Sequence, residues 1–260
     1  MNIKEGKDIL TYDDIEAIQR HTTSSGSYYR GLASTNYRLL SSLTREIEKV
    51  ENARKADAYI WNKISTNKVI CGFFKYPIGK MSREQEWELA LLCRHSGVLS
   101  RIMDFTPNTK IACWFASIEK ENEDGVVWEM VVPRSIRAEK GFAKFPSPCE
   151  ISETQFFRSV IVDKGEKSFS CNAVRNAIHQ SSFSFIQSIE NAIIPLDLQN
   201  IDEMQLIRHR IPAASKKIIV NVMKDFKVAQ KYPDFVYAED AIVKNEIEKI
   251  NEEAKKLFND

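Results

Sequence analysis

The sequence predicts an α+β domain in which helices pack around a small, mostly antiparallel sheet. Residues 125–133 form a near-continuous apolar run, which is typical of a buried central strand. Apolar residues also recur at helical spacing on both sides of a polar segment at residues 94–108. With 260 residues, of which 43% are hydrophobic, the chain can bury a sizeable core as one large domain.

The first part of the chain carries patterns of both helix and strand. We expect residues 1–20 to form a short helical lead-in. A polar breaker at 22–27 separates it from a short strand at 28–30, which Gly31 closes. Apolar residues spaced by four and by three indicate a helix within residues 43–64.

Two further helices are expected on either side of the polar segment. Ser82 and Gln85 have the spacing of a capping box, which opens a helix that Gly97 ends. Thr106 precedes Pro107, and a proline in the first turn gives up an N–H that would have no helical partner. The third helix therefore starts at this pair and turns its apolar residues inward, namely Ile111, Trp114 and Phe115.

The second half of the chain predicts a loop at 134–155 and three short strands. These strands are expected at 159–162, 183–186 and 192–195, with a helix at about 170–179 between the first two.

The chain divides into three predicted parts. Residues 1–24 are the lead-in, residues 25–238 are the main domain, and residues 239–260 are a charged helix packed on it. This last helix is expected to place one set of apolar residues on one side: Ile242, Ile247, Ile250 and Leu257.

Charge and hydropathy exclude several classes of protein. The 37 basic and 36 acidic residues give a net charge of +1, so a general polyanion-binding surface is not expected. Lys216 and Lys217 are predicted to lie on a solvated face. No apolar run approaches the roughly 20 residues of a membrane span. The polar start of the chain has no signal-peptide core, which predicts a cytoplasmic protein.

The cysteines and histidines do not indicate a metal site. The five cysteines are odd in number and show no short paired spacing, which favours free thiols in a reducing compartment. Cys93 and Cys113 fall on apolar helix faces and are expected to be small core residues. The four histidines are scattered and lack ligand spacing, so no metal is predicted.

The polar segment at residues 94–108 contains the densest group of reactive and hydrogen-bonding side chains in the sequence. Its cations, histidine, carboxylate, hydroxyl and amide suit a ligand with phosphates, riboses or a base. Other roles are open for three of its residues. His95 would also fit as a partner of the last carbonyls of its helix, Asp104 as an ion-pair partner of Arg101, and Thr106 as a helix N-cap. A capping role at a helix start is compatible with anion binding.

Arg30 and Gln180 are candidate ligand residues outside that segment. The guanidinium of Arg30 can bind phosphate oxygens with two parallel hydrogen bonds, and Gly31 lets a phosphate approach the backbone. The alternative for Arg30 is a surface ion pair. Gln180 follows the predicted helix, where it can reach a ligand amide or a ribose hydroxyl, or else cap the backbone.

Three blocks of the chain are similar to the FRG domain, a family named for its Phe/Tyr-Arg-Gly start. Their order and spacing match over roughly residues 25–240. The blocks are residues 28–31; residues 86–88, 95–97, 100–106 and 112–116; and residues 175–180 with Phe183.

The first two blocks also resemble the ADP-ribosyltransferase fold, in which an aromatic-Arg-Gly strand holds NAD by its phosphates. Gln180 stands where those transferases usually carry a glutamate, and Glu150, Glu153 and Glu190 are nearby in sequence. Either Gln180 replaces the glutamate, or another glutamate serves, or the site binds without turnover. The resemblance therefore implies NAD as substrate and assigns catalysis to Arg30, His95 and Gln180. The resemblance and the polar segment together give the candidate NAD-binding residues Tyr29, Arg30, Gly31, His95, Arg101, Asp104, Thr106 and Asn108.

The resulting expectation is an NAD-dependent ADP-ribosyltransferase of the toxin or phage-defence type. Its acceptor would be RNA, DNA or protein, and an antitoxin or chaperone is a possible partner; no membrane partner is expected. The alternatives are a non-catalytic nucleotide- or nucleic-acid-binding module and a structural scaffold.

Overall fold

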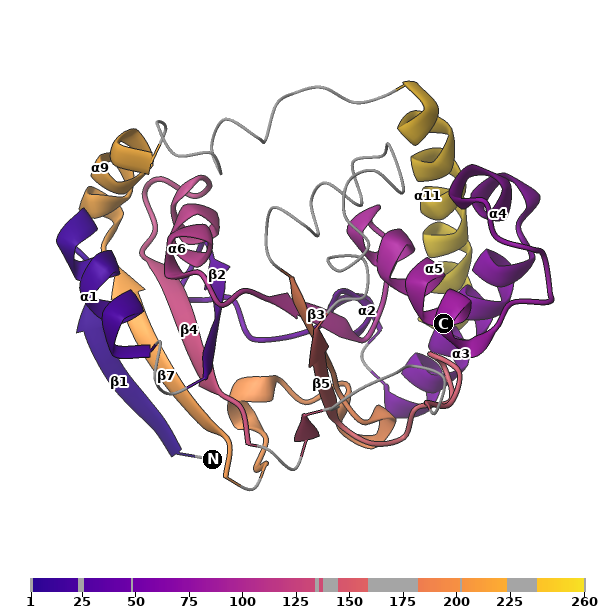
Figure 1. The fold of residues 1–260 in the computed structure, drawn as a ribbon, viewed down its shortest axis with the longest axis horizontal. Helices are drawn as coiled ribbons and strands as arrows, with labels where there is room; N and C mark the ends of the chain where they lie inside the picture. The colour runs from indigo at the N-terminus through magenta and orange to yellow at the C-terminus, as the bar shows by residue number, and fades with distance from the viewer. Residues whose placement is uncertain are drawn as a thin grey trace.

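The structure is a computed structural model, and it describes most of the 260 residues. The described ranges are residues 2–22, 26–47, 49–133, 136–137, 145–158, 182–201, 203–223 and 238–259. A four-stranded sheet with its helices forms one side of the molecule, a group of helices forms the other side, and a three-stranded sheet lies between them (Figure 1). The predicted α+β class with small sheets is therefore confirmed in outline.

The four-stranded sheet has the strand order β1-β7-β4-β2. Strand β4 (Gly125–Val131) lies inside it and pairs antiparallel with both β7 (Gln205–Ile211) and β2 (Ser27–Leu32). Every residue from 125 to 130 is buried, which explains the continuous apolar run and confirms the predicted central strand. Strand β1 (Asn2–Asp8) forms the outer edge and runs parallel to β7.

One face of this sheet is covered by three helices, α1 (Tyr12–Thr22), α6 (Thr109–Ser117) and α9 (Ala213–Met223). Their apolar faces meet Tyr29 and Val127 of the sheet in a single buried cluster. Cys113 of α6 is fully buried in this cluster, as expected.

The three-stranded sheet packs on the opposite face of the first sheet. It consists of β3 (Ile102–Phe105), β6 (Phe183–Ile186) and β5 (Gln155–Arg158), all antiparallel and in that order. A second buried cluster, which includes Phe105, Phe185 and Trp128, joins the two sheets. Two 3₁₀ turns follow β6, at Ile189–Asn191 and Leu196–Leu198.

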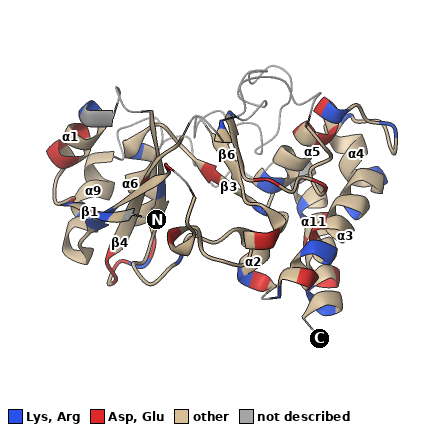
Figure 2. Cartoon of the chain, turned by 90° about the horizontal axis from the view of Figure 1, so that it is seen from below, with Lys and Arg blue, Asp and Glu red and all other residues tan. Residues whose placement is uncertain are grey.

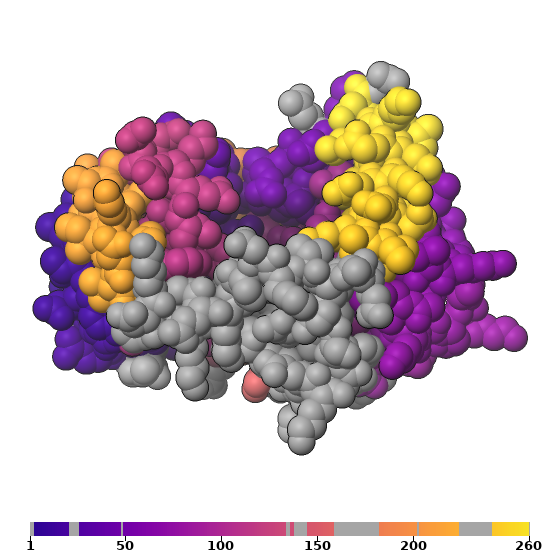
Figure 3. All heavy atoms as spheres, turned by 90° about the horizontal axis from the view of Figure 1, so that it is seen from above, coloured from indigo at the N-terminus to yellow at the C-terminus, as the bar shows by residue number. Residues whose placement is uncertain are grey.

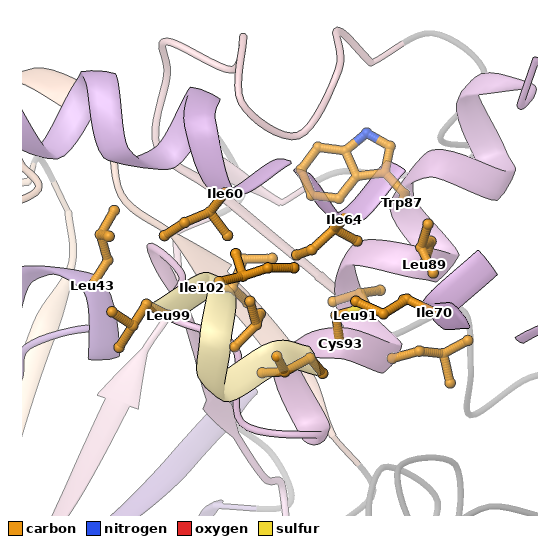
Figure 4. Packing of buried hydrophobic residues seen from close by; sticks show 14 of the residues in the cluster. Leu43, Ile60, Ile64, Ile70, Trp87, Leu89, Leu91, Cys93, Leu99 and Ile102 are labelled. Carbon is orange, nitrogen blue, oxygen red and sulfur yellow. The ribbon is translucent and has the colours of Figure 1, made fainter. Parts of the chain in front are cut away.

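The helical side is built from α2 (Ser42–Glu46), α3 (Val50–Thr66), α4 (Lys68–Phe74), α5 (Arg83–His95) and α11 (Ala238–Phe258). Their apolar side chains converge in the largest cluster (Figure 4). Both hydrogen bonds of the predicted capping box are present at the start of α5. Cys93 is fully buried in this cluster, as predicted from its apolar helix face.

Several predicted elements differ from the structure. The lead-in is helical only from Tyr12, because residues 2–8 form the edge strand. The helix within residues 43–64 is two helices, α2 and α3. Residues 192–195 are not a strand but follow the first 3₁₀ turn. The expected strand at 159–162 and helix at 170–179 lie outside the described residues.

The buried face of α11 is rotated from its predicted position. Ile242 and Leu257 are 58% and 57% exposed, whereas Ile247 and Ile250 are buried as expected. Val243 and Ala254 complete the buried stripe, which packs against α3 and α4.

Charged side chains of both signs occur on the helices of both sides (Figure 2). Among the described helices, none combines the length and the apolar character that crossing a bilayer would require.

Candidate functional site

A pocket of about 290 Å³ opens between the two sides of the molecule. Strand β2, the end of α5, strand β3 and helix α6 form its walls. Seen from above, the surface is hollowed between α6 and the helical side (Figure 3). The lining residues are Tyr29, Arg30, Gly31, Arg94, His95, Gly97, Asp104, Phe105, Thr106, Ile111, Ala112 and Phe115.

A backbone bridge between the two sheets brings the distant blocks together. The N–H of Tyr29 donates to the carbonyl of Thr106 over 2.7 Å, and the N–H of Thr106 donates to the carbonyl of Tyr29 over 2.9 Å. This bridge places Arg30 beside strand β3, where its Nη1 donates to the carbonyl of Asp104 over 2.6 Å. Four residues were expected to line one cleft, namely Arg30, His95, Asp104 and Gln180. The first three line the same pocket, and Gln180 lies outside the described residues.

Arg30 keeps an unused donor in this pocket. Its Nε is buried and has no hydrogen-bond partner within the described residues. Burial lowers the pKa of Arg30 to about 10, with the charges of Arg94 and Arg45 acting in the same direction and Asp104 opposing them. The guanidinium is still protonated at neutral pH, so it offers a positive charge and a free N–H to a ligand.

His95 ends helix α5 and points into the pocket with only 4% of its side chain exposed. Its Nε2 lies 3.9 Å from Oδ1 of Asp104 and has no hydrogen-bond partner in the described part of the chain. Burial lowers the pKa of His95, and this effect outweighs the attraction of Asp104. The imidazole is therefore neutral at pH 7 and lines the same pocket as Arg30 with an unsatisfied nitrogen.

Asp104 is the counter-ion of the cations in the pocket. Burial alone would raise its pKa, but Arg94, His95, Arg30 and a hydrogen bond from Ser182 outweigh burial and hold the pKa below its usual range. Nη2 of Arg94 lies 3.3 Å from Oδ2 of Asp104, and Oγ of Ser182 donates to Oδ1 over 3.5 Å. The partner of Asp104 is thus Arg94, and the expected Arg101–Asp104 pair is wrong.

Arg101 is a core residue and does not line the pocket. Its side chain is 1% exposed, and Nε donates to Asp57 of α3 over 2.8 Å. Its Nη atoms donate to three backbone carbonyls, those of Gln187, Pro148 and Ile151. The assignment of Arg101 to NAD binding is therefore corrected to a structural role between helix α3 and the three-stranded sheet.

The start of helix α6 also differs from the prediction. The N-cap is Asn108, whose Oδ1 accepts from the N–H of Lys110 over 3.0 Å, and the helix begins at Thr109. Oγ1 of Thr106 accepts from the N–H of Asn108 over 3.1 Å and lines the pocket. Thr106 thus keeps its place in the site, whereas Asn108 is engaged in capping and lies outside the pocket lining.

Gly31 is needed for packing. A Cβ at this position would lie 1.8 Å from the carbonyl oxygen of Ala112, because helix α6 crosses directly over strand β2. The absence of a side chain at Gly31 therefore lets the backbone of helix α6 approach the strand. It does not serve to make room for a ligand phosphate. Gly31 still borders the pocket, as does Tyr29, whose ring is buried.

Two further cations, Arg94 and Arg45, act on the charge of Arg30 in the pocket. Arg94 belongs to the polar segment, and its position in the last turn of α5 next to His95 is the sequence signal for its place in the pocket. Arg45 comes from α2, and no sequence pattern points to it. Gln180 lies outside the described residues. Within those residues, no three His, Cys, Asp or Glu side chains gather in a way that could hold a metal ion.

The lowered pKa of His95 predicts a loss of stability in mild acid. Below about pH 6.5 the unfolded chain binds a proton at His95 that the folded chain resists. The contribution of His95 to the free energy of unfolding is therefore fully present above this pH. It falls as the pH drops toward the pKa of the folded state, by at most about 1.4 kcal/mol per pH unit for this one proton. We expect His95→Gln to reduce this loss in urea unfolding between pH 7.5 and 5.5. An unchanged pH slope in the variant would contradict the assignment.

The chain was compared with known protein families, curated proteins and solved structures. No curated protein and no solved structure matches the chain. The matched segment runs from just before β2 to the first residue of β4, and every lining residue of the pocket lies within it. The part of the chain that builds the pocket, residues 25–125, matches the family model of the FRG domain.

Proposed function

We propose that the pocket binds NAD through its pyrophosphate and that the protein transfers ADP-ribose to a nucleic acid or protein acceptor. The observation that carries this proposal is the pair of unsatisfied nitrogens, Nε of Arg30 and Nε2 of His95, in one pocket. A buried donor without a partner costs about 1–3 kcal/mol. Phosphate oxygens would satisfy the guanidinium and meet the positive charge of Arg94.

The size of the pocket is consistent with part of a dinucleotide. Ligand pockets commonly measure about 300–1,000 Å³, and the volume of about 290 Å³ lies at the lower end of this range. The pyrophosphate and one ribose would lie inside, and the rest of NAD would extend past the mouth. Phe115 and Ile111 provide the apolar wall on the α6 side.

The proposed transfer breaks the bond between nicotinamide and ribose C1′. The bonding electrons leave with nicotinamide, and C1′ develops oxocarbenium character, as in glycoside cleavage. An acceptor nucleophile then bonds to C1′ and loses its proton. His95 is neutral and can take that proton at its unpaired nitrogen, while Arg30 and Arg94 hold the pyrophosphate. Interactions that tighten as charge develops would accelerate this step.

A second candidate function is nucleotide binding without turnover. It is favoured by the state of Asp104, the carboxylate among the lining residues. Because Asp104 is ion-paired with Arg94 and hydrogen-bonded by Ser182, it is less available to bind a ribose hydroxyl. A role as a toxin or phage-defence protein, with an antitoxin or chaperone partner, is proposed on the family resemblance alone.

The first test is thermal stabilisation by NAD. A ligand at a hundredfold excess over its Kd adds about 2.7 kcal/mol. At roughly 2–4 °C per kcal/mol, the melting temperature should rise by about 5–11 °C. We expect Arg30→Ala to abolish this shift, because it removes the unpaired donor and its charge. Arg54→Ala is the matched control, since Arg54 is an exposed arginine whose partner is Glu190 and which lies outside the pocket.

The second measurement separates transfer from binding. Wild type, Arg30→Ala and His95→Gln are incubated with labelled NAD and total RNA, DNA or cell lysate. Label on one fraction with wild type only would support the transferase. A melting shift without transfer to any fraction would favour the binding module, and an unchanged melting curve at millimolar NAD would count against both.

A further inference from the structure

The C-terminal helix reaches the turn behind the pocket through one side chain. Asn251 of α11 accepts a hydrogen bond at Oδ1 from the N–H of Leu99 over 3.0 Å. Its Nδ2 donates to the carbonyl of Gly97 over 3.1 Å. Asn251 is 9% exposed; its bond to Leu99 is buried and its bond to Gly97 is partly buried. An asparagine amide, with a donor and an acceptor side by side, is suited to bracket two backbone groups in this way.

The turn that Asn251 holds follows directly on the residues that line the pocket. Helix α5 ends at His95, and Gly97 then turns the chain with a φ of +101°. A Cβ at Gly97 would meet nothing within 4 Å, so glycine is favoured at this position for its backbone conformation and not for lack of space. The turn is also closed by two backbone bonds, from the N–H of Gly97 to the carbonyl of Arg94 over 3.2 Å and from the N–H of Val98 to the carbonyl of Cys93 over 3.0 Å.

A second contact fixes the far end of the same segment. Oγ of Ser42, at the start of α2, accepts from the N–H of Ser100 over 3.0 Å. The N–H of Leu43 donates to the carbonyl of Ser100 over 3.2 Å. The chain between Gly97 and Ser100 is thus held from two sides, by α2 and by α11. Among the described residues, Asn251 is the side chain of α11 that bonds to this segment.

We infer that Asn251 is a positioning residue for the pocket: it fixes the turn after α5 and so holds Arg94 and His95 in place for an anionic ligand. The residue lies outside the segment that matches the FRG domain and far from the pocket in sequence. Through it, the docking of α11 on α3 and α4 is coupled to the geometry of the site. The inference rests on the proposed function in one respect only, the choice of ADP-ribose as the ligand.

The test compares variants of the full chain by two readouts. The first is the titration of the His95 imidazole by NMR, and the second is the affinity for ADP-ribose by calorimetry. We expect Asn251→Ala to move the His95 titration toward its ordinary value and to weaken ADP-ribose binding about tenfold. Asn251→Asp keeps the acceptor for Leu99 but turns an anionic oxygen toward the carbonyl of Gly97, so it should show both effects.

Val243→Ala is the matched control, because Val243 is buried on the same helix and belongs to its apolar face. It should lower the melting temperature without changing either readout. If the Asn251 variants behave like Val243→Ala, the residue only stabilises the fold and the inference is overturned. If Asn251→Ala does not fold, the same two readouts of Asn251→Asp test the inference. If wild type does not bind ADP-ribose, the proposed function fails, while the His95 titration still decides the inference.

Discussion

Replacing Arg101 by alanine is expected to lower the free energy of unfolding by about 3–5 kcal/mol. The guanidinium is buried, and its removal leaves the carboxylate of Asp57, whose side chain is 14% exposed, without its partner. Three backbone carbonyls lose their donors at the same time. Removing one partner of a buried pair is costly because the other charge stays desolvated.

Urea denaturation measures this loss, and two variants sharpen it. Arg101→Lys keeps the charge, but one ammonium with three donors cannot replace a planar fork that reaches Asp57 and three carbonyls, so we expect it to remain clearly destabilised. Asp57→Asn leaves the buried charge of Arg101 without its counter-ion, so it should also be destabilising, but less than Arg101→Ala because the three bonds from Arg101 to backbone carbonyls remain. A loss below about 1 kcal/mol for Arg101→Ala would contradict the structural role.

The second large effect is expected from Gly31→Ala. The added methyl group would stand 1.8 Å from the carbonyl oxygen of Ala112 and 2.8 Å from the N of Ala116, both backbone atoms of helix α6. Neither atom can move without shifting the helix. Overpacking commonly costs about 1–3 kcal/mol, and we expect at least the upper end of that range. Because α6 also lines the pocket, the affinity for any pocket ligand should fall with the stability.

Gly72→Ala provides the control for this change. Gly72 lies within helix α4, and a Cβ there would meet nothing within 4 Å. Alanine is the better helix former, so this variant should gain roughly 0.5–1 kcal/mol. Melting temperatures of the two glycine variants should therefore move in opposite directions. A stability for Gly31→Ala equal to that of wild type would show that α6 does not rest on β2 as described.

Some elements of the fold could be predicted because their signals are local. The apolar run of β4 and the capping box of α5 depend on neighbouring residues only. Strands β1 and β7 carried no such signal: β1 is an exposed edge with residues such as Lys4 and Glu5, and β7 mixes arginines with apolar residues. Strand β3 has four residues and lies within a polar segment, so no periodicity could develop.

The hydrogen-bond and ion-pair partners of the site residues could not be predicted, because they depend on the tertiary structure and not on separation along the sequence. The proximity of Arg101 and Asp104 in sequence suggested an ion pair, but extended residues three apart point to opposite faces. The environment of Lys216 could not be predicted for the same reason. It was expected on a solvated face, yet its Nζ is buried and donates to the carbonyls of Ala33, Glu119 and Lys120. These acceptors lie on distant loops that no local pattern links to Lys216.

The parallel pairing of β1 with β7 has a consequence for synthesis on the ribosome. Ile3 is paired with Leu206, so the first strand has no partner until about 200 further residues have been made. At roughly 5–20 residues per second, that delay is on the order of 10–40 seconds. Strands β2 and β4 can pair earlier, and the largest apolar cluster still lacks α11 at that stage. The nascent chain therefore exposes unfinished sheet edges for most of its synthesis, and a chaperone that shields them would raise the yield of folded protein.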